Sequence, residues 1–67
     1  MYHIMLTFQR GLKTAVQVMN FHREQIITFT LDEMENEDFP KDLKEYILPR
    51  LDDIKEGKWH YTGEHKK

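Results

Sequence analysis

The chain of 67 residues contains no cysteine and no serine, and only three glycines and two prolines. The lack of cysteine excludes disulfides, thiolate nucleophiles and cysteine-based zinc sites. The lack of serine leaves threonine and tyrosine as the side chains that could supply a nucleophilic hydroxyl group. The glycines stand far apart, so no glycine-rich phosphate-binding loop is present. Because these absences remove most catalytic motifs, we expect a protein that is not an enzyme.

Long apolar runs are missing too. No apolar stretch approaches the roughly 18 residues that a membrane-spanning helix requires. The segment from Met1 to Arg10 lacks the basic start, the apolar run and the small-residue cleavage site of a signal peptide. Together with the absence of cysteine, these features predict a cytoplasmic protein with no membrane association.

The chain is short but rich in large apolar anchors, with four phenylalanines, three tyrosines and one tryptophan. This aromatic content predicts a folded chain rather than a disordered one. A domain of this size buries only about 60% of the surface that its unfolded chain exposes, so its core is small. We expect a single domain over residues 1–62 and a frayed tail over residues 63–67. Formation of a homo-oligomer is one way in which such a domain could bury more surface.

The first half of the chain has the pattern of β-strands. Residues 2–9 alternate in polarity, which places Tyr2, Ile4, Leu6 and Phe8 on one predicted face. Residues 25–31 alternate in the same way and are rich in β-branched and aromatic side chains. Between them, Gly11 suits the tight turn of a hairpin.

Residues 14–21 fit two patterns. As a strand, this segment carries Val16 and Val18 on one face, and its threonine, valines and phenylalanine favour extended backbone. As a helix, it carries a stripe formed by Leu12, Ala15, Val16 and Met19. We favour the strand, which makes the first half a three-stranded antiparallel meander, and the helix remains as the alternative.

The second half predicts an acidic loop followed by a helix. Residues 32–38 contain five acids and predict a loop with room for one helical turn. Apolar residues then recur at steps of three and four over residues 39–54, the spacing of an amphipathic helix. We expect Asp38 to cap this helix, Pro40 to occupy its first turn and Gly57 to end it. Pro49 cannot donate a backbone hydrogen bond, so it predicts a kink, or a break between two short helices, near Leu48.

The predicted fold class is therefore α+β. It consists of a three-stranded antiparallel meander, a proline-kinked amphipathic helix packed on one sheet face, and a short C-terminal strand or extension around Trp59. If residues 14–21 are helical, the order becomes βαβα. The predicted core joins one sheet face to the helix stripe and contains Phe8, Phe29, Leu43, Ile47 and Leu51.

The four histidines, which are candidate metal ligands, lie far apart in the sequence. His3, His22, His60 and His65 fit neither the i, i+4 spacing of one helix face nor an alternating pair. We therefore expect no metal site and no cofactor, and surface positions for these side chains.

The charge of the chain is sorted along its length. Ten of the twelve acidic residues fall between Asp32 and Glu56, whereas both flanking regions carry a small excess of positive charge. An acidic segment of this kind is either a solvated face or a recognition surface that attracts a basic partner. We expect a small protein-binding module, such as an inhibitor, an antitoxin-like factor or a regulator, whose partner is a protein with a basic surface.

The expected contact residues are the ten acids and one aromatic anchor: Asp32, Glu33, Glu35, Glu37, Asp38, Asp42, Glu45, Asp52, Asp53, Glu56 and Trp59. Trp59 has a second interpretation, as a lid on the edge of the core. In its overall composition the chain is similar to accessory proteins of phages and mobile elements, a resemblance that rests on no motif.

The alternative function is nucleic-acid binding through Arg10, Lys13 and Arg23, with aromatic side chains stacking on unpaired bases. The net charge of −2 disfavours this alternative, because a phosphate backbone would be repelled. The repulsion is smaller if the acidic helix lies on the side of the sheet opposite to the ligand.

Overall fold

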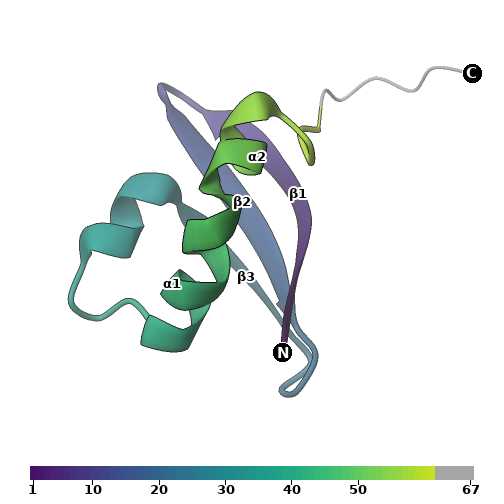
Figure 1. Ribbon diagram of the computed structural model, residues 1–67, viewed down its shortest axis with the longest axis vertical. Coiled ribbons are helices and arrows are strands. Elements are labelled where there is room, and N and C mark those ends of the chain that lie inside the picture. Colours follow the sequence, from purple (N-terminus) through teal and green to yellow (C-terminus); the bar gives the residue numbers. More distant parts are fainter. Residues whose placement is uncertain (62–67) are drawn as a thin grey trace, which may run out of the picture.

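The first half of the chain forms an antiparallel sheet in the computed structural model, which describes residues 1–61 (Figure 1). Its strands are β1 (Tyr2–Arg10), β2 (Lys13–Asn20) and β3 (Gln25–Thr30), in the spatial order β1-β2-β3. The predicted meander is confirmed. Because residues 13–20 are extended, the helical alternative with the order βαβα is wrong. The predicted domain end at residue 62 and the predicted frayed tail lie outside the described residues.

Two short turns connect the strands. Gly11 has a φ of 65° between β1 and β2, the left-handed conformation that favours glycine. Between β2 and β3, the side-chain oxygen of Asn20 accepts hydrogen bonds from the backbone N–H groups of His22 and Arg23. Asparagine side chains commonly stabilise turns by accepting hydrogen bonds from the backbone N–H groups of the residues that follow.

A β-bulge interrupts β1 at Met5. The pairing with β2 runs from Ile4 opposite Val18 to Leu6 opposite Gln17, so Met5 is an extra residue. An extra residue reverses the facing of all later side chains in the strand. The prediction that Leu6 and Phe8 share a face with Ile4 is therefore wrong, and so is the placement of Phe8 in the core. The buried side chain after the bulge is Thr7, which is only 1% exposed.

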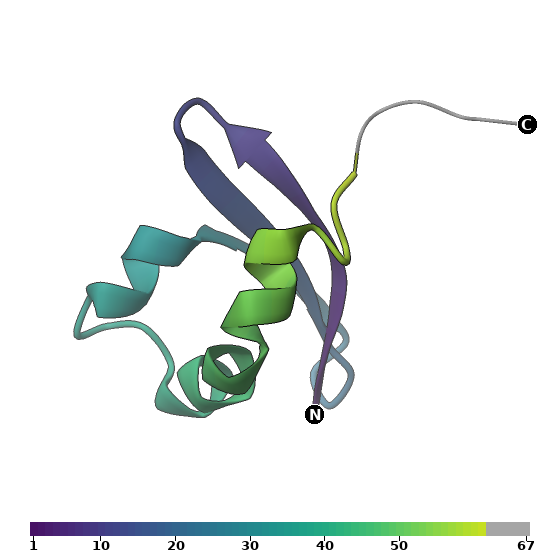
Figure 2. The same cartoon turned by 45° about the horizontal axis from the view of Figure 1, so that its top comes forward.

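The helical elements pack on one face of this sheet (Figures 1 and 2). They are η1 (Leu31–Glu35), α1 (Lys41–Ile47), η2 (Leu48–Arg50) and α2 (Leu51–Glu56), where η denotes a 3-10 helix. The 3-10 turn of η2 contains Pro49, so the predicted break in the helix is present. Within residues 1–61, no helix has the length and apolar character needed to cross a bilayer.

The predicted cap at the start of the helix is wrong. Asp38 makes no capping bond, and α1 begins at Lys41 directly after Pro40, whose carbonyl accepts a hydrogen bond from Lys44 N–H at 3.1 Å. The side chain of Asp42 instead accepts the N–H of Leu43 at 2.8 Å. A carboxylate in the first turn satisfies an N–H group that has no partner within the helix.

The core lies between the helix stripe and the inner face of the sheet. Its buried apolar side chains form one cluster that contains Ile4, Val16, Val18, Phe29, Met34, Leu43, Ile47 and Ile54. Of the predicted core, Phe29, Leu43 and Ile47 are confirmed, and Leu51 is half-buried against the cluster. Met34 was not predicted, because it stands alone among acids.

The segment that follows α2 is hydrogen-bonded to β1. Gly57, with a φ of 90°, ends α2 as predicted, and the N–H groups of Gly57 and Lys58 return to the carbonyls of Ile54 and Asp53, each at 3.1 Å. The chain then runs beside β1, where Thr7 exchanges hydrogen bonds with Trp59 and Tyr61 at 2.9 and 2.7 Å. This segment is the predicted C-terminal extension.

Replacing Gly57 by alanine should destabilise the protein by about 1–2 kcal/mol, because alanine pays a steric cost in the left-handed conformation. The nearest atom to an added Cβ is the Cβ of His60 at 3.6 Å, an ordinary contact, so the cost comes from the backbone. The free energy of unfolding from urea denaturation measures the effect. Gly57→Asn is the matched control and should cost less, since asparagine tolerates this conformation. Equal losses for both variants would contradict the explanation.

Candidate functional site

All ten predicted acids are exposed, and they belong to four parts of the chain. They lie on η1, on the connection over residues 36–40, on α1 and on α2, and thus on elements that cover the inner face of the sheet (Figures 1 and 2). On α1 and α2 this outward placement follows from the helix period, because their apolar stripe is turned toward the sheet.

The acidic segment, residues 32–38, is held in place by two apolar contacts, one within it and one directly after it. Met34 is 5% exposed and belongs to the core cluster, so its neighbours Glu33 and Glu35 are directed to solvent. Farther along, the ring of Phe39 meets that of Phe29 edge to face, with centroids 4.9 Å apart. Aromatic pairs in this geometry contribute about 0.5–1.5 kcal/mol beyond burial of their area. The segment therefore has a defined course despite its like charges.

Few of the acids are neutralised by a cation. Asp32 pairs with Lys13 at 3.1 Å, and Asp53 pairs with Lys58 at 3.9 Å, with all four side chains at least half exposed. Over residues 1–61, the other eight acids make no ion pair within 4.0 Å. Exposed pairs of this kind contribute little stability. Most of the negative charge is thus presented to solvent.

Asp32 is the acid most firmly tied to the sheet. Its carboxylate accepts hydrogen bonds from the Thr30 hydroxyl and from the Lys13 ammonium group. These two hydrogen bonds, with the Thr30 bond the larger cause, hold the pKa of Asp32 below its ordinary value. Asp32 therefore closes the junction between β3 and η1 and is less available to a partner than its neighbours.

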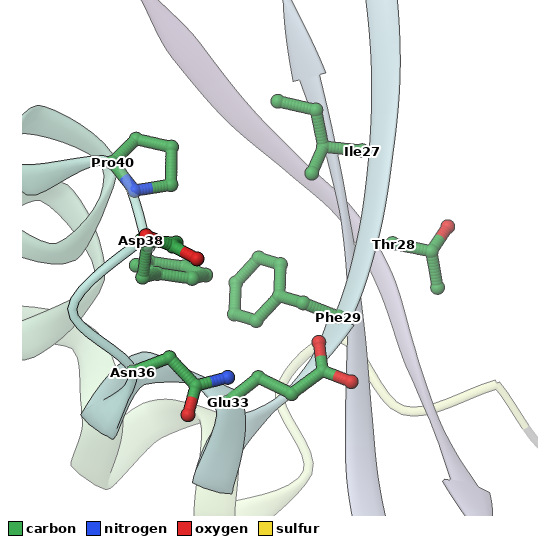
Figure 3. A pocket seen from close by; sticks show the side chains of 8 residues that line it. Ile27, Thr28, Phe29, Glu33, Asn36, Asp38 and Pro40 are labelled. Atoms are coloured by element: carbon green, nitrogen blue, oxygen red, sulfur yellow. The ribbon is translucent and has the colours of Figure 1, made fainter.

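A hollow of about 260 Å³ lies between β3 and the acidic segment (Figure 3). Its apolar lining comes from β3 and from the residues that precede α1, and its polar lining comes from Thr28 of β3 and from the acidic segment. The lining residues are Ile27, Thr28, Phe29, Glu33, Asn36, Asp38, Phe39 and Pro40. Two predicted contact residues, Glu33 and Asp38, are thereby brought to one concave place although they are five positions apart.

The sequence did not predict this hollow. Phe39 was assigned only to the helix stripe, and no residue of the predicted strand over residues 25–31 was assigned to a binding site. The available signal was the pair Phe39-Pro40 at the end of an acidic run, because a large ring there needs an apolar partner. Without the position of Phe29 that partner could not be named.

A second hollow of about 560 Å³ is lined by Met1, Tyr2, Asp42, Tyr46 and Arg50. The hydroxyl of Tyr2 donates to Asp42 at 3.0 Å, and the guanidinium group of Arg50 lies 4.0 Å from the centre of the Tyr46 ring. Burial, and then the bond to Asp42, raises the pKa of the Tyr2 phenol, which stays protonated at neutral pH. A protonated phenol is a hydrogen-bond donor and not a general base.

The histidines and Trp59 stand apart from both hollows. His3 lies beside Phe21 with ring centroids 6.1 Å apart, His22 lies in a turn and His60 pairs with Thr7, while His65 is outside the described residues. In the described part of the chain, no three potential metal ligands cluster. The ring of Trp59 is half-buried against the core cluster, in line with its interpretation as a lid.

Comparisons of the chain with protein-family models, with curated proteins and with solved structures find no match. The geometry and charge of the described residues therefore carry the functional argument.

The hydrogen bonds of Asp32 predict a pH-dependent contribution to stability. A carboxyl group whose pKa is lowered by folding stabilises the folded state above its unfolded pKa, and this contribution is lost as the pH falls through the folded pKa. Asp32→Asn should therefore be less stable than the wild type at pH 6, and the difference should shrink below about pH 4. Urea unfolding over a pH series measures it.

The control is Asp52→Asn, because the Asp52 side chain makes no hydrogen bond or ion pair within residues 1–61. This control should show a smaller difference at every pH. A difference for Asp32→Asn that is the same at pH 3 and pH 6 would contradict the assignment.

Proposed function

We propose that the protein is a small, non-enzymatic binding module that recognises a basic surface on another protein through its acidic side chains. The observation that carries this proposal is the exposure of ten acids, eight of which lack an ion pair among the described residues. Such a surface raises the rate of association with a basic partner and repels acidic ones. An inhibitor or antitoxin-like factor that occupies the basic site of its target fits this chemistry, and so does a regulator.

The fixed course of the acidic segment supports recognition over simple solvation. A solvated acidic face needs no defined backbone, whereas Met34 and Phe39 hold this segment against the core. Preorganisation reduces the conformational entropy that binding would otherwise cost. The carboxylates are therefore arranged before a partner arrives.

Binding is better supported than catalysis. The Tyr2 and Asp42 pair is the candidate acid and base set in the larger hollow, and the raised pKa of Tyr2 makes this phenol a poor base. We also place the protein in the cytoplasm, since a chain without cysteine gains nothing from an oxidising compartment.

A second candidate function is binding of single-stranded nucleic acid on the outer face of the sheet. The observation in its favour is that the acidic elements cover the inner face, whereas Arg10 lies 5.6 Å from the ring centre of Phe8 on the outer face. Against it, Lys13 is paired with Asp32. The charge of the molecule favours the protein-binding proposal.

The combined variant Glu33→Lys, Glu35→Lys and Glu37→Lys should weaken binding to polylysine by at least about tenfold at low salt, because it reverses three uncompensated charges. Fluorescence titration against labelled polylysine at two salt concentrations measures the effect. The affinity of the wild type should fall as the salt concentration rises.

The control is Glu24→Lys, which reverses a charge in the turn between β2 and β3, and circular dichroism should confirm that all variants are folded. Unchanged polylysine binding by the triple variant would count against the proposed function. Salt-sensitive retardation of a single-stranded oligonucleotide, lost when Arg10, Lys13 and Arg23 are replaced by glutamine, would support the second candidate instead.

A further inference from the structure

The outer edge of β3 is the open edge of the sheet. The other edge strand, β1, is covered near its middle by residues 59–61, whereas no described segment pairs with β3 on its far side. An open edge presents N–H and C=O groups that can pair with a further strand.

The register of the sheet identifies the groups that are open. Thr7 directs its N–H and C=O groups away from β2, because they bond to Trp59 and Tyr61. In an antiparallel pair, two opposite residues either exchange both backbone hydrogen bonds or exchange none. Thr7 exchanges none with Val16, which lies opposite it, so Val16 directs its N–H and C=O groups toward β3. The bond from Ile4 N–H to the Tyr46 hydroxyl at 3.3 Å gives the same alternation.

The same alternation determines the direction of the backbone N–H and C=O groups in β3. Phe29 lies opposite Val16 and Ile27 lies opposite Val18, so both direct their backbone groups toward β2. The intervening residues, Ile26 and Thr28, direct their N–H and C=O groups away from the sheet. Both are exposed, Ile26 at 55%.

The hollow beside this edge is complementary to a long basic side chain. No lysine, arginine or histidine lines it, and the carboxylates of Glu33 and Asp38 make no ion pair within residues 1–61. Figure 3 shows Glu33 and Asp38 on different sides of the Phe29 ring, with Ile27 next along the strand. Aromatic and proline surfaces pack against the methylenes of lysine or arginine, while carboxylates at the rim bind the charged end.

We propose that β3 and this hollow bind an extended basic segment of the partner protein as an added strand. The backbone of the segment bonds to Ile26 and Thr28, and its basic side chains, at every second position, enter the hollow opposite Ile27 and Phe29. Its remaining side chains lie on the outer face beside Ile26 and are apolar. This inference rests on the proposed function and specifies the site and the mode of binding.

The probe is a capped hexapeptide of alternating arginine and valine, RVRVRV, compared with the block peptide RRRVVV of equal composition and charge. The alternating peptide should bind at least about tenfold more tightly, because only its arginines all point to one side of a strand. Calorimetry measures both affinities. Equal affinities would overturn the inference and leave the proposed function standing, whereas no binding of either peptide or of polylysine would contradict both.

Amide hydrogen exchange of the wild type gives a test that needs no variant. Adding RVRVRV should protect the amides of Ile26 and Thr28, while those of Ile27 and Phe29 are already bonded to β2 and should change little. No new protection at Ile26 and Thr28 would overturn the inference. Protection of these amides in the free protein that rises with protein concentration would also overturn it, because a second copy would then occupy the edge.

Two sets of variants test separately the contribution of the backbone hydrogen bonds and that of the charges to binding. Thr28→Pro removes an N–H group that points outward, so it preserves the ladder with β2 and should abolish the preference for RVRVRV, while Thr28→Val should keep it. Glu33→Gln with Asp38→Asn should weaken binding of RVRVRV, whereas Glu24→Gln, in the turn between β2 and β3, should not. If folded Thr28→Pro keeps the full preference, strand addition is wrong.

Discussion

One apolar helix stripe packs on one face of the sheet, and this contact determines how the other elements are arranged. Leu43 and Ile47 from α1 and Val16 and Val18 from β2 are completely buried. Complete burial of such a side chain contributes about 1.5–3 kcal/mol, which is large for a domain of marginal stability. Because this contact fixes the rotation of the helix about its axis, it also fixes which side of α1 and α2 carries the charges.

Packing against the same core also fixes the position of the acidic segment, which could not fold alone. Five acids in seven positions repel one another, and a segment of this composition has little apolar surface to bury. Met34 and Phe39 supply the missing anchors on either side of Asn36, Glu37 and Asp38. These two apolar contacts give the exposed carboxylates defined positions.

Much of the fold could be predicted from the sequence, because its signals are local. The alternation in β2 and β3, the helix stripe, the break at Pro49 and the end at Gly57 each depend on residue type and spacing. The facing of β1 could not be predicted, because a bulge depends on pairing with β2 and leaves no mark in the pattern of β1 itself. The absence of a cap by Asp38 has a similar cause, since the contact of Phe39 with Phe29 decides the course of the chain there.

The candidate site was predictable in part. The exposure of the ten acids follows from charge alone. The hollow beside β3 could not be derived, because it needs Phe29, Glu33 and Phe39 to meet across three elements. The open groups of Ile26 and Thr28 likewise depend on a register that the hydrogen bonds of Thr7 and Ile4 reveal.

The bridge between Thr7 and His60 has a consequence for biosynthesis. These partners are 53 positions apart, so β1 leaves the ribosome long before the segment that completes its outer edge exists. Contacts of such large sequence separation form late and slow folding. During translation the nascent three-stranded sheet therefore carries two unprotected margins, and residues 59–61 later cover the middle of the one on β1.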